Sequence, residues 1–126
     1  MGLTDNNPVE ELPLGTVDGI LAAPDLNLEG ELFPVPEWQC SIKVRGMTKR
    51  EQIDIRNKSI RGSEVDASVS EMLTFITCVV EPKFQESHYG QLIEKSAGVI
   101  DRVLKKAMSL SGANVDFGEL KLTFRG

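Results

Sequence analysis

The sequence predicts a mainly α-helical fold with a minor β component, an α+β domain in which a compact helical body carries one or two short strands. Helix-capping patterns and apolar residues at helical spacing fill residues 48–112, and one segment before them alternates between apolar and polar residues. With 126 residues, 40% of them hydrophobic, the chain can bury one compact core. We expect an acidic, flexible arm at 1–34, a helical domain at 35–112 and a tail at 113–126 that can form a strand.

Proline and acidic residues set the amino-terminal arm apart. The first 36 residues hold five of the six prolines, and proline interrupts helices. The first 42 residues carry eight acidic residues and no Lys or Arg, whereas the remainder has a formal charge of +3. Repulsion between the acids predicts an extended, mobile segment that cannot sustain a helix. Its apolar residues, among them Ile20, Leu21 and Phe33, can dock on the body or on a partner, and the sequence does not choose between these.

Ordered structure is expected to begin at Trp38. The apolar residues Trp38, Cys40, Ile42 and Val44 alternate with polar ones up to Gly46, a period of two that predicts a strand with one covered face. A strand needs a partner, and the other clear alternation, Leu120, Leu122 and Phe124, lies in the tail. We therefore expect these two segments to pair.

A capping box predicts the first helix. Thr48 and Glu51 have the spacing at which a hydroxyl and a carboxylate each satisfy a free backbone amide. The helix is expected over 49–61, stopping near Gly62. Its apolar face consists of Ile53 and Ile60, with Ile55 to one side, so most of this helix should be solvated.

The next helix should lie at the centre of the core. Ser68 and Glu71 repeat the capping pattern, and the run from Met72 to Val80 is apolar nearly all round. The β-branched residues at its end predict a change to extended chain near Val79, and Pro82 then enforces a break.

Two further helical segments follow. Ser87 can cap a short helix that carries Tyr89, Leu92 and Ile93, and Ser96 either caps a new helix or lies within a continuing one. The last helix has the clearest amphipathic period and should end at Ser111 and Gly112. Its apolar positions are Ile100, Val103, Leu104, Ala107, Met108 and Leu110, and its outer face carries Asp101, Arg102, Lys105 and Lys106.

Few residues suggest catalysis or metal binding. Cys40 and Cys78 lack neighbours at ligand spacing, and we favour buried free thiols over a disulfide between them. The single histidine, His88, is interpreted as a surface residue. Glu51 and Asp54 could form an acid and base pair, but the basic residues beside them favour ordinary surface ion pairs. We expect no enzyme activity, no cofactor and no metal site.

Basic residues concentrate in residues 43–61, on the end of the predicted strand and on the helix that follows it. This stretch holds seven bases and two acids. Its positive charge fits contact with nucleic acid, with the acidic arm or with an acidic partner, and it also fits a solvated surface. The overall acidity favours solvent or protein contact over nucleic acid. No run long and apolar enough for a membrane span is found, and no secretory signal. The basic residues are Lys43, Arg45, Lys49, Arg50, Arg56, Lys58 and Arg61.

The order of these landmarks resembles that in the tail assembly chaperones of long-tailed bacteriophages and prophages. The resemblance covers roughly residues 35–112. It rests on Val35-Pro36-Glu37-Trp38, the strand ending Val44-Arg45-Gly46-Met47-Thr48, the apolar helix ending Cys78-Val79-Val80, the turn Pro82-Lys83-Phe84, Leu92-Ile93-Glu94-Lys95-Ser96, and Ile100-Asp101-Arg102-Val103 closing in Leu110-Ser111-Gly112. The chain departs from the family pattern at the short turn before Phe84, which lacks an Asp-Gly insertion, and at His88-Tyr89-Gly90, which replaces a more acidic helix start.

The resemblance implies a non-catalytic factor in the cytoplasm of the bacterial host. Such a factor binds the tape measure protein, keeps it soluble and helps to recruit tail tube subunits, and it is absent from the finished virion. We expect it to form a homo-oligomer. The candidate partner-binding residues are Ile20, Leu21, Phe33, Trp38, Leu120, Leu122 and Phe124.

Two other classes of protein remain open from the sequence. A structural virion protein, such as a head-tail connector subunit, would stay in purified particles. A small nucleic-acid-binding regulator would use the basic stretch 43–61, and its binding to DNA would weaken steeply with salt.

Overall fold

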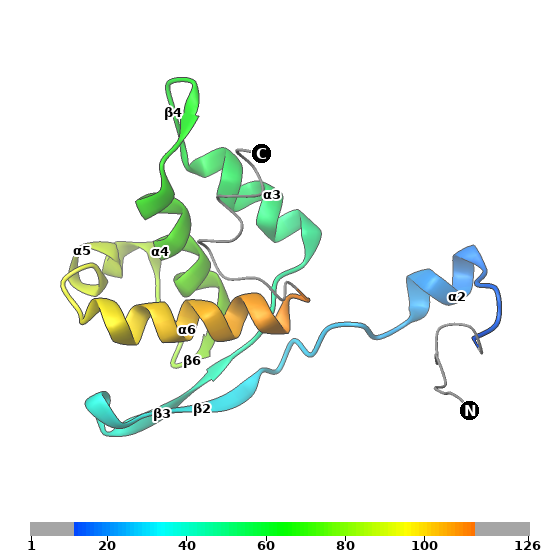
Figure 1. Cartoon of the computed structure of the whole chain (residues 1–126), viewed down its shortest axis with the longest axis horizontal. Helices are drawn as coiled ribbons and strands as arrows, with labels where there is room; N and C mark the ends of the chain where they lie inside the picture. The colour runs from blue at the N-terminus through cyan, green and yellow to red at the C-terminus, as the bar shows by residue number, and fades with distance from the viewer. Residues whose placement is uncertain (1–11, 113–126) are drawn as a thin grey trace, which may run out of the picture.

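The core lies where a small antiparallel sheet meets two helices, α4 and α6, in a computed structural model that describes residues 12–112 (Figure 1). The fold is mainly α with a minor β component, as the sequence predicts. In chain order the elements are α2 (Val17–Ala22), β2 (Glu31–Val35), η1 (Pro36–Trp38), β3 (Cys40–Val44), α3 (Lys49–Lys58), β4 (Ile60–Arg61), β5 (Glu64–Val65), α4 (Ala67–Cys78), β6 (Val79–Glu81), η2 (Glu86–His88), α5 (Tyr89–Leu92) and α6 (Ala97–Leu110).

The sheet has three strands in the order β2-β3-β6. β2 pairs with β3 along its whole length, from Glu31 opposite Val44 to Val35 opposite Cys40, and β6 pairs with β3 at Lys43 and Val44. The strand predicted from Trp38 to Val44 is therefore confirmed from Cys40 onward. The predicted partner 120–124 lies outside the described residues, and within them β3 pairs with β2 and β6 instead.

The prediction that order begins at Trp38 is wrong, because β2 starts seven positions earlier, at Glu31. The boundary placed at residue 34 falls inside this strand. Pro34 is tolerated since β2 is an edge strand, where a missing backbone donor costs no ladder hydrogen bond. The proline-rich composition therefore marks an edge strand here and not only an arm.

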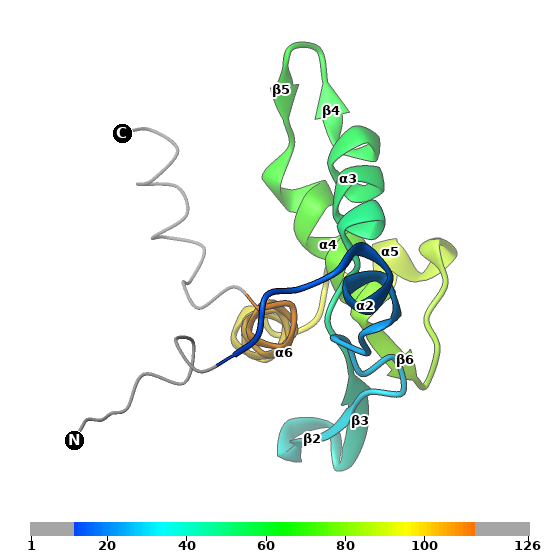
Figure 2. The same ribbon diagram turned by 90° about the vertical axis from the view of Figure 1, so that its right-hand side faces the viewer.

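A short helix, α2, interrupts the arm that was predicted to be extended. Thr16 caps it, accepting a hydrogen bond from the Gly19 amide at 3.1 Å. The helix contains no proline, so the prolines on either side, Pro13 and Pro24, limit its length without preventing it. Figure 1 shows α2 standing apart from the helical body, joined to β2 by residues 23–30, which we name the linker. Figure 2 views the molecule from that side, with α2 in front of the body.

Helix α3 begins as predicted, with the complete capping box of Thr48 and Glu51. It ends at Lys58 and not at Arg61, because Ser59 closes the last turn by donating its hydroxyl to the Ile55 carbonyl at 2.6 Å. The β4–β5 hairpin then projects from the body around Gly62, which has a φ of 66° (Figure 1).

The predicted apolar face of α3 is wrong. Ile55 is the buried residue, whereas Ile53 and Ile60 are 48% and 45% exposed. Ile55 is buried because this side of α3 packs against α4. Three isoleucines do not define a helix face without knowledge of that neighbour.

Helix α4 is the central helix of the core, as expected, with six buried residues. Its cap is Asp66, which accepts from the amides of Ser68 and Val69, so the prediction of Ser68 as the cap is wrong. The predicted change to extended chain is confirmed, since β6 starts at Val79. Phe75, fully buried on this helix, packs its ring against Trp38 and Phe84.

The last two helices are separate. Gln85, and not Ser87, precedes the short helical segment η2 and α5, whereas Ser96 caps α6 and so begins a new helix. Leu92 is buried and Ile93 is exposed. Helix α6 buries the predicted apolar positions from Ile100 to Met108 against the sheet and α4, while Leu110 is partly buried. The helix ends before Gly112, which has a φ of 89°.

Candidate protein-binding surface

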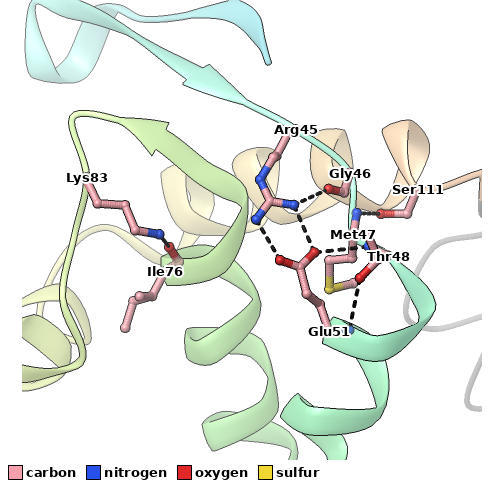
Figure 3. A network of polar contacts seen from close by, with 8 residues as sticks. All are labelled: Arg45, Gly46, Met47, Thr48, Glu51, Ile76, Lys83 and Ser111. Atoms are coloured by element: carbon pink, nitrogen blue, oxygen red, sulfur yellow. Dashed lines mark hydrogen bonds and ion pairs between the residues drawn. The ribbon is translucent and has the colours of Figure 1, made fainter. Parts of the chain in front are cut away.

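Polar contacts tie the start of α3 to the sheet and to the end of α6 (Figure 3). Arg45 donates two hydrogen bonds to Glu51, at 2.9 and 2.7 Å, and a third to the Gly46 carbonyl. The Met47 amide donates to the Ser111 hydroxyl at 2.9 Å, and that hydroxyl donates to the Ala107 carbonyl. This junction fixes where α3 leaves the sheet.

Glu51 is part of this junction through its ion pair with Arg45. The hydrogen bond from Arg45, helped by the Thr48 amide, lowers the pKa of Glu51 from its ordinary 4.5 to about 2. The ion pair therefore forms with Arg45, the residue that follows β3, and not with the bases of α3 as predicted. Asp54 is exposed on α3 and lines a small hollow against α4 together with Glu51.

The burial of His88 and of Cys40 differs from the prediction. His88 is half-buried: its Nδ1 accepts from the Gln85 amide at 2.9 Å, and its ring meets Phe84 edge-on. Both cysteines are free, but Cys40 is exposed and only Cys78 is buried, so the prediction of two buried thiols is half wrong. Burial raises the pKa of Cys78 to about 12. Among residues 12–112, no group of His, Cys, Asp and Glu is placed to hold a metal ion.

Residues 12–22, which we name the apolar arm, carry a run of exposed apolar side chains, among them Leu14, the most exposed large apolar residue of residues 12–112. Their exposed fractions run from 65% for Ile20 to 98% for Leu14, and α2 buries none of its residues. Isolated exposed apolar residues are normal, but a cluster of them is typical of a contact surface. The exposed members are Leu12, Leu14, Val17, Ile20 and Leu21.

The structure separates the candidate partner-binding residues into groups. Ile20 and Leu21 are free for contact on α2. Phe33 and Trp38 are partly buried and pack against the domain's own core. Leu120, Leu122 and Phe124 lie outside the described residues.

The predicted partner-binding set did not include Leu12 and Leu14. Both flank Pro13 in the segment predicted to be an acidic, flexible arm. Their apolar character beside the helix cap Thr16 was the available signal.

The seven basic residues of 43–61 also separate into groups. Lys43 pairs with Glu81, Arg45 with Glu51, and Lys58 with Glu86, while Lys49 contacts Gln52 and Arg61 contacts backbone carbonyls. Arg50 and Arg56 are exposed and have no ion pair with another described residue. The open positive charge therefore lies on the outer side of α3.

Acids from the amino-terminal region contact α6 and not α3. Glu37 receives two hydrogen bonds from Arg102, at 2.8 and 2.7 Å, and Lys106 lies 3.1 Å from Glu31. The Arg102 contact lowers the pKa of Glu37 to about 2. These pairs hold β2 and η1 against α6 and leave the acids of the linker and α2 without a basic partner among the described residues.

Comparison with family models, with curated proteins and with solved structures finds no match to this chain. Within residues 12–112, no helix is long and apolar enough to cross a membrane.

Proposed function

We propose that this protein is a non-catalytic tail assembly chaperone, which binds the tape measure protein of a long-tailed phage and keeps it soluble while tail tube subunits assemble. In this proposal it acts in the host cytoplasm, forms a homo-oligomer and leaves before the virion is complete. The proposal combines the family resemblance of residues 35–112 with the apolar arm.

The observation that carries the proposal is the exposure of the apolar arm. Leu21 is 79% exposed and Ile20 is 65% exposed, on a helix that makes no use of them in its own core. An amphipathic helical client offers apolar side chains at matching helical spacing, and covering them removes apolar surface from water on both sides. The arm is thus built to bind another protein chain.

The two carboxylates whose pKa is lowered have a structural role in this proposal. The carboxylates with lowered pKa, Glu37 and Glu51, are each held by an arginine at the junctions between elements. Their chemistry is that of structural ion pairs.

The test is co-expression with a long helical tape measure protein. We expect soluble complex from the natural sequence, and we expect Leu21→Glu to reduce recovery of that complex. Ile93→Glu is the matched control, because Ile93 is 46% exposed outside the arm and its replacement leaves the arm intact. A client that stays equally soluble without this protein, or that never co-purifies with it, would refute the proposal.

A structural virion protein is the main alternative, and particle composition distinguishes the two. A chaperone is missing from purified virions, whereas a head-tail connector subunit is retained in them. Detection of this chain in stoichiometric amounts in mature particles would favour the connector.

A further inference from the structure

Two exposed surfaces of this molecule have complementary chemistry. The first is the apolar arm, whose exposed apolar residues are accompanied by one acid, Asp18. The second is a stripe on the outer side of α3 formed by Lys49, Ile53 and Arg56, which we name the outer stripe. Its members are spaced four and three residues apart, so they share one face of the helix.

The outer stripe combines an apolar centre with positive ends. Ile53 is 48% exposed, and Lys49 and Arg56 are both exposed on either side of it. Arg56 makes no ion pair with another described residue, and Glu51, the acid nearest in sequence to Lys49, is already held by Arg45. The stripe therefore suits an acidic, apolar helix.

The apolar arm is such a helix. In α2, Val17, Ile20 and Leu21 share one face by their spacing, and Asp18 lies one turn before Leu21. From residue 12 to residue 30 the chain carries three acids and no base. Charge and apolar character thus match between the arm and the stripe.

We propose that the apolar arm of one copy docks on the outer stripe of α3 in a second copy of this chain. Since the same arm serves client binding in the proposed function, this exchange deepens that proposal and rests on it for its biological role. It covers the arm while the client is absent, and the client then competes for it.

The linker directs the arm to a second copy. Leu26 and Leu28 line a hollow of about 500 Å³ together with Met47, Lys49 and Leu110, so this part of the linker faces the amino end of its own α3 across that hollow. Pro24 follows Ala23, which closes α2 in an extended conformation, and this stiff exit carries α2 away from the body (Figure 1). Residues 23–30 can span at most about 28 Å, enough to cross a neighbouring helix about 10 Å wide.

The exchange is heterologous, because each copy gives an arm and receives another on a different surface. Such contacts build chains or rings and not only closed pairs. One helix of six residues buries little area, so each contact should be weak and association should depend on concentration.

The test is sedimentation velocity on the full chain from about 1 to 300 μM, the range in which a small interface dissociates. We expect species larger than a dimer to accumulate with concentration. Leu21→Glu in the arm, or Arg56→Glu in the stripe, should each weaken association by about tenfold or more. Lys105→Glu, the same charge change on the outer face of α6, should associate like the natural sequence.

Mixing the two defective variants gives the sharpest outcome. Leu21→Glu keeps an intact stripe and Arg56→Glu keeps an intact arm, so together they should form a one-to-one pair that cannot extend. The proposal is overturned if the natural chain stays monomeric over the whole range, if Arg56→Glu associates normally, or if the mixture forms no pair. Because no client is present, these outcomes are independent of the co-expression test.

Discussion

Gly46 lies directly against the backbone of Leu110. A Cβ atom placed on Gly46 would be 2.5 Å from the Leu110 carbonyl oxygen and 2.8 Å from the Ser111 nitrogen. The end of β3 and the end of α6 therefore approach each other as closely as two backbones can, and the Met47 to Ser111 hydrogen bond forms beside this contact.

Gly46→Ala should destabilise the domain, because the added methyl group meets backbone atoms that cannot rotate away. We expect a loss of about 1–3 kcal/mol in the free energy of unfolding, typical of overpacking. Gly90→Ala is the control, since a Cβ there meets no atom within 4 Å. Urea denaturation of both variants measures the difference, and equal stabilities would contradict the close approach.

Glu51→Gln should destabilise the protein at neutral pH and not at low pH. The folded-state pKa of Glu51, about 2, lies below the ordinary 4.5, so the unfolded chain takes up this proton first as pH falls. The stabilisation is complete above pH 4.5 and is lost as pH falls toward 2.

At pH 7 we expect Glu51→Gln to cost about 1–3 kcal/mol, the usual contribution of a hydrogen bond to a charged group. Thermal unfolding of the variant and the natural sequence at several pH values gives the measurement. Asp54→Asn on the same helix serves as the control. A difference that stays constant down to pH 2 would argue against the Arg45 pairing.

Phe75→Ala should lower the free energy of unfolding more than Gly46→Ala or Glu51→Gln does. The ring is fully buried between Trp38, at 6.4 Å between centroids, and Phe84, at 5.6 Å. We expect a loss of about 3–5 kcal/mol, as for other buried aromatic residues replaced by alanine.

The chain has a single tryptophan, so the fluorescence of Trp38 reports this substitution directly. Its emission should shift to longer wavelength in the variant at temperatures where the natural protein is folded. An unchanged spectrum and unchanged stability would mean that Phe75 is not the centre of the core.

The thiols should differ sharply in reactivity. Cys40 is exposed, whereas burial raises the pKa of Cys78 to about 12. A thiol reagent at pH 8 should therefore modify Cys40 quickly and Cys78 only when the protein unfolds. Cys40→Ser should remove the fast phase, and two fast phases in the folded natural protein would disprove the assignment.

Local signals in the sequence predicted local structure well. The capping box of Thr48 and Glu51 was found because its partners are three residues apart. The end of α4 at Val79 and the amphipathic period of α6 were likewise contained in short segments.

The sequence predictions that were wrong concern features that depend on residues far away in the sequence. The burial of Ile55 is set by α4, and the strand β2 exists because β3 lies beside it. Phe33 and Trp38 are candidate partner-binding residues in the sequence but pack on the core, whereas Ile20 and Leu21, equally apolar, do not. Apolar character alone does not tell a core residue from a contact residue.

The pairing of Glu31 with Val44 also determines how the molecule responds to mechanical load. β2 and β3 form a hairpin whose open end holds both the linker and the start of the path to α3. A pull on the linker would first break the ion pair between Glu31 and Lys106 and would then separate the two strands one residue pair at a time. Tension on the linker would therefore reach the core in steps, since Val35, the last residue of β2, is the one that is buried in it.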